Sequence, residues 1–203
     1  MAKNINSNGF DYVDLGLPSG TLWATMNVGA SKPSDYGLYF QWGDSKGYTK
    51  EQFGKDKMFT WADYKWSIDG SDSNFSKYTK EGSALDLADD AANANMGGDW
   101  HLPTDDQTIE LIENTTSTWS TQDGVNGRLF ISKKDTSKSI FIPAAGGAWD
   151  GSIHGSGGDG DVWCSLLRAG DVYCGRYLSF YSDSAYLLGG YRYNGFSVRG
   201  VIG

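Results

Sequence analysis

The sequence is poor in the residues that usually build disulfide scaffolds, metal centres and catalytic sites. Its 203 residues include two cysteines, two histidines and four prolines. Cys164 and Cys174 are too few for a disulfide-framed scaffold, and the sequence leaves open one bridge or two free thiols. Neither His101 nor His154 has the serine or cysteine and carboxylate neighbours of a catalytic triad. We therefore expect a non-enzymatic protein without a cofactor.

Positive charge and long apolar runs are also scarce. There are 17 Lys plus Arg against 25 Asp plus Glu, which gives a formal net charge of -8. This acidity disfavours nucleic acid and anionic lipid surfaces as partners, because both would be repelled at long range. No stretch is long and apolar enough to insert into a membrane, and the first residues lack a basic start, an apolar run and a cleavage site. We expect no signal peptide and a soluble chain that is virion-associated or exported by another route.

Glycine and aromatic residues are abundant instead, with 28 Gly, 12 Tyr and 8 Trp. This mixture is typical of a loop-rich domain in which glycine forms the turns and aromatic rings fill an irregular core. A chain of this length commonly forms one domain. We expect an N-terminal tail at residues 1–11 and a single domain at residues 12–203.

The middle of the chain predicts two short helices, at about residues 84–96 and 105–114. The first has a start signal at Ser83 with Asp86 three residues later, and the second has Thr104 followed by Gln107 as a capping box. Before them, residues 47–80 are polar, rich in aromatics and poorly periodic. We interpret that segment as a long surface excursion pinned by Trp61, Tyr64 and Trp66.

Short strand-like runs lie on both sides of the helices, from residue 12 to 66 and again from residue 127 onward. The run from Arg176 to Ser182 alternates Leu178 and Phe180 with Tyr177, Ser179 and Tyr181. Successive side chains of a strand point to opposite faces, so this pattern predicts a core face and an opposite face that is open to a partner. The expected class is α+β, with two short helices, antiparallel strands and long loops.

Five strings resemble the FISUMP-type (Fibrobacter succinogenes major paralogous) domains, which are similar to the C-type-lectin-like fold of formylglycine-generating enzymes. They are YVDLGLPSGTLWATMNVGA, YGLYFQWGD, DDAANANMGGDWHLPT, SIFIPAAGG and RYNGFSVRGV, in order along the chain. The resemblance implies a C-type-lectin-like fold. The family commonly has Arg where this chain has His101, a departure that bears on local packing. Asp159 and Asp161 lie in a GGDGD loop that lacks the spacing of a calcium site, and we expect no metal.

The C-terminal third is also similar to the variable proteins of diversity-generating retroelements. In such proteins a reverse transcriptase rewrites template adenines, and the resulting codons cannot encode Lys, Glu, Gln, Met or Trp. Residues 1–163 contain 32 of these residues, whereas residues 164–203 contain none. The last 40 residues hold 6 Tyr, 7 Gly and 5 Ser, a composition like that of antibody loops. A tight strand region with little room for long side chains would give the same absence.

These features predict a ligand- or receptor-binding protein whose C-terminal surface, at residues 162–192, is diversified by a retroelement to recognise a phage or bacterial surface target. The partner would be a protein or another cell-surface ligand of unknown identity. The alternative is an invariant structural or adhesin-like domain without a diversified site. The expected ligand-binding residues are Cys164, Leu167, Arg168, Asp171, Tyr173, Cys174, Arg176, Tyr177, Ser179, Tyr181, Asp183, Tyr186, Leu187, Leu188 and Tyr191.

Overall fold

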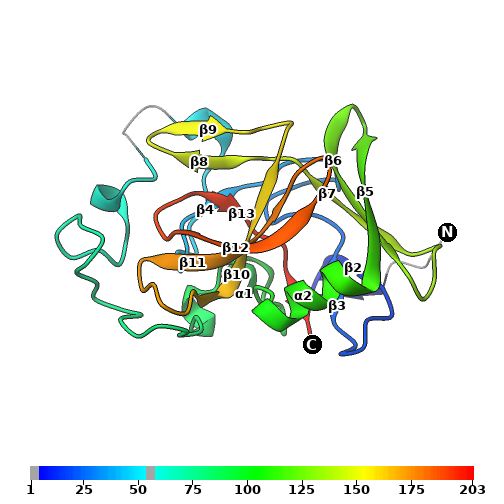
Figure 1. The fold of residues 1–203 in the computed structure, drawn as a ribbon, viewed down its shortest axis with the longest axis horizontal. Helices are drawn as coiled ribbons and strands as arrows, with labels where there is room; N and C mark the ends of the chain where they lie inside the picture. The colour runs from blue at the N-terminus through cyan, green and yellow to red at the C-terminus, as the bar shows by residue number, and fades with distance from the viewer. Residues whose placement is uncertain (1–4, 54–57) are drawn as a thin grey trace.

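The computed structural model describes residues 5–53 and 58–203, which form mostly β-structure with two α-helices (Figure 1). This content is compatible with the predicted α+β class. Three short 3-10 helices join them, at Lys50–Gln52 (η1), Trp61–Asp63 (η2) and Leu87–Asp89 (η3). No helix in the described ranges has the length and apolar content needed to cross a membrane.

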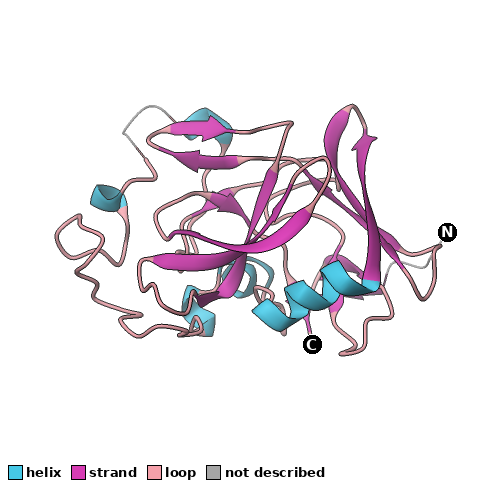
Figure 2. Ribbon diagram, in the orientation of Figure 1, coloured by secondary structure: helices cyan, strands magenta, loops and turns pink. Residues whose placement is uncertain are grey.

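The described strands form four sheets, which Figure 2 shows as magenta arrows. The largest has the order β12-β11-β10-β13-β4, with β10 and β13 parallel and its other neighbours antiparallel. Its strands are Tyr39–Phe40 (β4), Gly160–Leu167 (β10), Cys174–Phe180 (β11), Ala185–Tyr191 (β12) and Phe196–Ser197 (β13). The three-stranded sheet has Thr115–Gln122 (β5), Val125–Ser132 (β6) and Ser139–Pro143 (β7), and a hairpin joins Gly147–Trp149 (β8) to Ser152–His154 (β9).

The fourth sheet corrects the prediction of a tail at residues 1–11. Its order is β1-β2-β3-β14, made of Ile5–Ser7, Phe10–Asp14, Leu22–Ala24 and Val201–Ile202. Ile5 pairs with Tyr12, so residues 5–11 belong to a hairpin. Asn8 and Gly9 form its turn with positive φ angles of 50° and 85°, a conformation that Asn and Gly adopt readily. Residues 1–4 of the expected tail lie outside the described residues.

The two helices test the capping signals in different ways. Asp105–Asn114 (α2) begins as predicted, because Thr104 accepts a hydrogen bond from the backbone N–H of Gln107 in a capping box. The first helix is shorter than predicted and spans only Ala91–Met96 (α1). Its N-cap is Asp90, whose carboxylate accepts hydrogen bonds from the backbone N–H groups of residues 92, 93 and 102. The start predicted at Ser83 is wrong, since that side chain bonds to a preceding carbonyl instead.

The five-stranded sheet separates two apolar clusters. Trp163 in β10 faces one cluster, with Trp42 and Phe196, whereas Val162 and Leu178 face the other, with Leu111 of α2. The alternation follows from the strand geometry, because neighbouring residues of β10 point to opposite faces. Both faces of β10 therefore pack against apolar residues.

Arg192 joins the segment at residues 47–80 to the C-terminal strands. The side chain is fully buried, and its guanidinium donates hydrogen bonds to the Tyr64 hydroxyl at 2.9 Å and to the carbonyls of Val172 at 2.8 Å and Tyr78 at 3.2 Å. Burial lowers the pKa of this guanidinium. The segment predicted as a surface excursion is thus fastened through the protein interior, next to the loop that precedes β11.

Candidate functional site

The hairpin of β11 and β12 carries most of the predicted binding residues. The backbone N–H of Tyr181 donates to the carbonyl of Ser184 at 2.9 Å, which closes a tight turn at residues 182–183. The pairing register then places Tyr177 opposite Leu188 and Ser179 opposite Tyr186. Directly paired residues share a face, so these four lie on one side of the hairpin.

Helix α2 covers the other side of this hairpin. Leu178 of β11 is buried there, and Leu187 lies opposite it on β12. Arg176 points to the same side, where its Nε lies 3.0 Å from Oδ2 of Asp105 at the start of α2. Arg176 and Leu187 are both half-exposed, and they lie on the α2 side of the hairpin rather than on the side of Tyr177 and Leu188.

Six predicted residues come together around one hollow with a volume of about 430 Å³, which we call the concave site. It lies between the loop before β11 and the end of β12, so residues about twenty positions apart in sequence face each other. On the β12 side, Gly189 and Gly190 have no side chains that would fill this space. The lining comprises Arg168, Asp171, Tyr173, Cys174, Tyr177, Gly189, Gly190, Tyr191 and Asn194.

The charged groups that line the concave site form one ion pair. Arg168 Nη1 lies 3.1 Å from Asp171 Oδ2, three residues along the chain. Hydrogen bonding to Asp171 raises the pKa of Tyr173, and burial raises the pKa of the Cys174 thiol to about 11. At neutral pH the tyrosine hydroxyl and the thiol are therefore protonated donors, while the ion pair offers one charge of each sign to a ligand.

Aromatic rings form one rim of the concave site and extend beyond the residues that the sequence singled out for binding. Tyr191 stacks on Tyr193 with a centroid separation of 5.5 Å and an interplanar angle of 17°, and Tyr173 lies 6.1 Å from Tyr191. Trp61 of η2 packs edge-on against Tyr193 at 4.9 Å. The segment at residues 47–80 thus supports the rim, a contact between distant parts of the chain that local periodicity does not reveal.

Three other predicted binding residues are buried and cannot touch a ligand in this structure. Cys164 points toward α2, where its Sγ lies 3.2 Å from the Thr108 hydroxyl, and Leu167 belongs to the apolar core. Ser179 is fully buried and donates a hydrogen bond to Asp161 Oδ1 at 2.8 Å. The assignment of Ser179 to a solvent face is wrong because that part of the sheet is covered on both sides.

The remaining four predicted residues are exposed on the hairpin. Tyr181, Tyr186 and Leu188 are 41%, 52% and 36% exposed, and Tyr191 of the rim is 46% exposed. Asp183 is exposed in the turn, where it accepts a hydrogen bond from the Ser184 hydroxyl. Exposed apolar side chains that lie close together mark interaction surfaces more often than scattered ones do.

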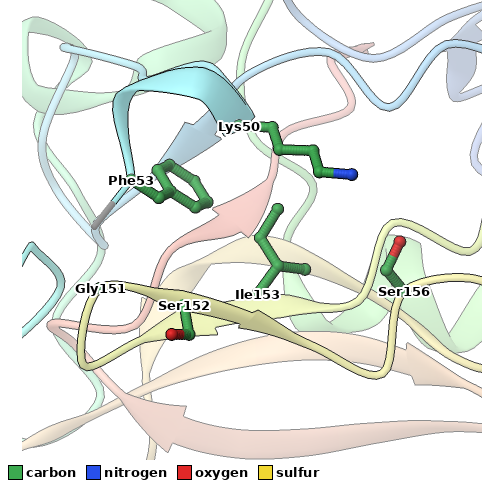
Figure 3. Close-up of a pocket in the computed structure, with 6 residues that line it drawn as sticks. All are labelled: Lys50, Phe53, Gly151, Ser152, Ile153 and Ser156. Carbon is green, nitrogen blue, oxygen red and sulfur yellow. The ribbon is translucent and has the colours of Figure 1, made fainter. Parts of the chain in front are cut away.

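A second hollow, with a volume of about 370 Å³, lies between η1 and the β8–β9 hairpin, away from the predicted residues. Figure 3 shows Phe53 and Ile153 pointing toward each other across it, with the Lys50 ammonium along one edge. Gly151, Ser152 and Ser156 complete its lining. Its polar groups belong to exposed lysine and serine side chains, so the concave site remains the better candidate.

Neither cysteine is in a disulfide, and burial raises the pKa of the Cys164 thiol to about 12. Within residues 5–53 and 58–203, no three His, Cys, Asp or Glu side chains are grouped so that they could hold a metal ion. A scan against protein-family models finds no match, and neither does a search of curated proteins or of solved structures.

Proposed function

We propose that this protein is a non-enzymatic binding protein of C-type-lectin-like fold, which recognises a protein or other cell-surface target through the concave site. One observation carries the proposal. Arg168, Asp171, Tyr173 and Tyr191, all expected from the sequence to bind a ligand, line a single hollow although they come from two separate segments. Tyrosine and arginine are enriched at binding hot spots, because each combines a large contact area with a polar group.

The composition of the C-terminal region supports a second part of the proposal, that a retroelement diversifies this surface. Residues 164–203 contain no Lys, Glu, Gln, Met or Trp, and the residues that line the concave site fall between positions 168 and 194. In this proposal the protein acts on a virion or a bacterial surface, where a changing target favours a changing binding face. The buried positions 164, 167 and 179 are excluded from that face.

Two experiments test the proposal. The diversification part predicts a reverse transcriptase gene near the coding sequence, together with a near-copy of the segment that encodes the C-terminal region. Absence of both would leave an invariant binding or adhesin-like domain. The binding part predicts that selection of the purified chain against a displayed library of bacterial surface proteins recovers a target, and that the target loses affinity when Tyr173 or Tyr191 is replaced by alanine.

A further inference from the structure

The described residues that line the concave site include one cation, and it is already paired. Arg168 is exposed and lies 3.1 Å from the carboxylate of Asp171. A second carboxylate, that of Glu81, accepts a hydrogen bond at 3.0 Å from the backbone N–H of Gly170, which lies between those two residues in sequence. The nearby Arg192 is fully buried, and its guanidinium is turned to the interior. Carboxylates therefore outnumber the exposed cation beside the hollow.

The aromatic rim of the concave site has a carboxylate near each end. Tyr173, at one end, is hydrogen-bonded to Asp171, which raises the pKa of its hydroxyl. At the other end, burial and the negative charge of Asp150 raise the pKa of Tyr193. Tyr191 contacts both of these rings, and 46% of it remains exposed. Negative charge on both sides of an exposed ring disfavours an anion there and favours a cation.

The rings of the rim also attract cations by themselves. The face of an aromatic ring carries partial negative charge, and a Lys or Arg group within about 6 Å of the ring centroid is attracted to it. Arg192 makes such contacts in the interior, where its Cζ lies 4.2 Å from the centroid of the Phe75 ring and 5.2 Å from that of Tyr64. The net charge of -8 adds a long-range attraction for a basic partner.

We propose that the concave site receives a Lys or Arg side chain from a basic segment of the target protein, with the cation over the exposed ring of Tyr191 and beside Asp171. The inference rests on the proposed function, because it names the chemistry of the partner that this site binds. The hollow, the exposed ring and the carboxylate lie together in one place. A cation that enters it gains an ion pair and a ring contact at once.

Arg168 competes with the target for the carboxylate of Asp171. Its side chain extends along β12, where it packs directly on Gly189: a Cβ added to that glycine would lie 2.5 Å from the Arg168 Cδ. The guanidinium thus stands at the wall of the hollow and neutralises the carboxylate that a cation of the target would approach. Removal of Arg168 should therefore strengthen the binding of a cation, whereas it would weaken the binding of an anion.

Titration with a basic peptide tests the proposal without knowledge of any target. Fluorescently labelled hexa-arginine should bind the purified chain saturably in an anisotropy measurement, and labelled hexaglutamate should not bind. Arg168→Gln should tighten hexa-arginine binding about threefold, because it frees the carboxylate. Asp171→Asn should weaken it about tenfold or more, because the charged acceptor is lost. Absence of hexa-arginine binding, or weaker binding by Arg168→Gln, would overturn the proposal.

Asp183→Asn is the matched control for general attraction between opposite charges. It removes the same charge from the exposed turn of the β11–β12 hairpin, outside the lining of the hollow, and should weaken hexa-arginine binding less than about twofold. Equal weakening by Asp171→Asn and Asp183→Asn would reveal long-range attraction only and would overturn the site.

The role of the ring is tested by two replacements of Tyr191. Tyr191→Phe keeps the ring and should keep the affinity for hexa-arginine, whereas Tyr191→Leu keeps an apolar side chain without a ring and should weaken binding about threefold or more. Equal affinities of these two variants would overturn the ring contact. A selected target that needs Tyr191 while hexa-arginine fails to bind would overturn this inference and leave the proposed function standing.

Discussion

Replacement of Arg192 by methionine should both destabilise the protein and loosen the concave site. The guanidinium lies 4.2 Å from the centroid of the Phe75 ring and donates to the Tyr64 hydroxyl and to the carbonyls of Lys77, Tyr78 and Val172. Methionine is also an unbranched side chain, but it has no hydrogen-bond donor. Three carbonyl oxygens and one hydroxyl would then lose a buried partner at once.

The expected loss of stability follows from these four acceptors, which are left without a donor. A buried acceptor left without its hydrogen bond costs about 1–3 kcal/mol. Removal of the charge offsets part of that cost, because Arg192 is buried without a carboxylate partner among the described residues. We therefore expect Arg192→Met to lower the free energy of unfolding by about 3–5 kcal/mol, measured by urea denaturation. Hydrogen exchange should accelerate at residues 61–78 and 171–173.

Arg199→Met is a matched control. Arg199 is equally buried, but it donates to the Asn27 side chain and to the carbonyls of Ala24 and Phe141, away from the concave site. The Arg199→Met chain should lose comparable stability without faster hydrogen exchange at residues 61–78. A free energy of unfolding for Arg192→Met within about 1 kcal/mol of that of the parent chain would refute this role of Arg192, and so would faster exchange in the same segments of both variants.

Three further predictions concern the β11–β12 hairpin, Asp161 and the two cysteines. Leu178→Ala should lower the free energy of unfolding by about 2–5 kcal/mol because it leaves a cavity, whereas Tyr186→Ala should change it by no more than about 0.5 kcal/mol. Equal changes in urea denaturation would contradict the assignment of Leu178 to the core face of the hairpin and Tyr186 to its exposed face. Burial raises the pKa of Asp161 to about 7 from 3.8, so the unfolded chain ionises first as pH rises. Stability should fall between about pH 4 and 7, on the order of 4 kcal/mol from this group, and Asp161→Asn should abolish that part of the pH dependence. The double variant with Cys164→Ser and Cys174→Ser should still fold, judged by circular dichroism, because no disulfide is lost.

Local signals in the sequence were sufficient where the structure depends on neighbouring residues. The capping box at Thr104 and Gln107 lies within one turn, and it correctly marks the start of α2. The signal at Ser83 failed because Asp90 caps the helix while also accepting from the backbone of Leu102, a partner that only the folded chain provides. Strand β5, at residues 115–122, was not predicted, since its polar sequence lacks apolar alternation.

The sequence indicated which part of the chain forms the candidate site, but not which of its side chains are exposed. Strand alternation correctly places Leu178 in the core, but it does not reveal whether the opposite face is covered. Ser179 is buried because Asp161 of β10 lies opposite it in the register. Trp61 was missed as a rim residue because it contacts Tyr193 from a distant part of the chain. Asn194 was missed because it lies just beyond the predicted region at residues 162–192, in the turn after β12 where its backbone N–H donates to the carbonyl of Tyr191.

The affinity of a selected target for the Tyr191→Ala chain tests the proposed function most directly. Truncation of a central aromatic anchor typically costs about 2 kcal/mol or more, so Kd should rise about thirtyfold or more. Ile68→Ala is the control, because Ile68 is 61% exposed within the segment at residues 47–80 but does not line the concave site. The account predicts weaker binding for Tyr191→Ala and unchanged binding for Ile68→Ala. Unchanged binding for Tyr191→Ala with loss for Ile68→Ala would contradict it and make the segment at residues 47–80 the binding element.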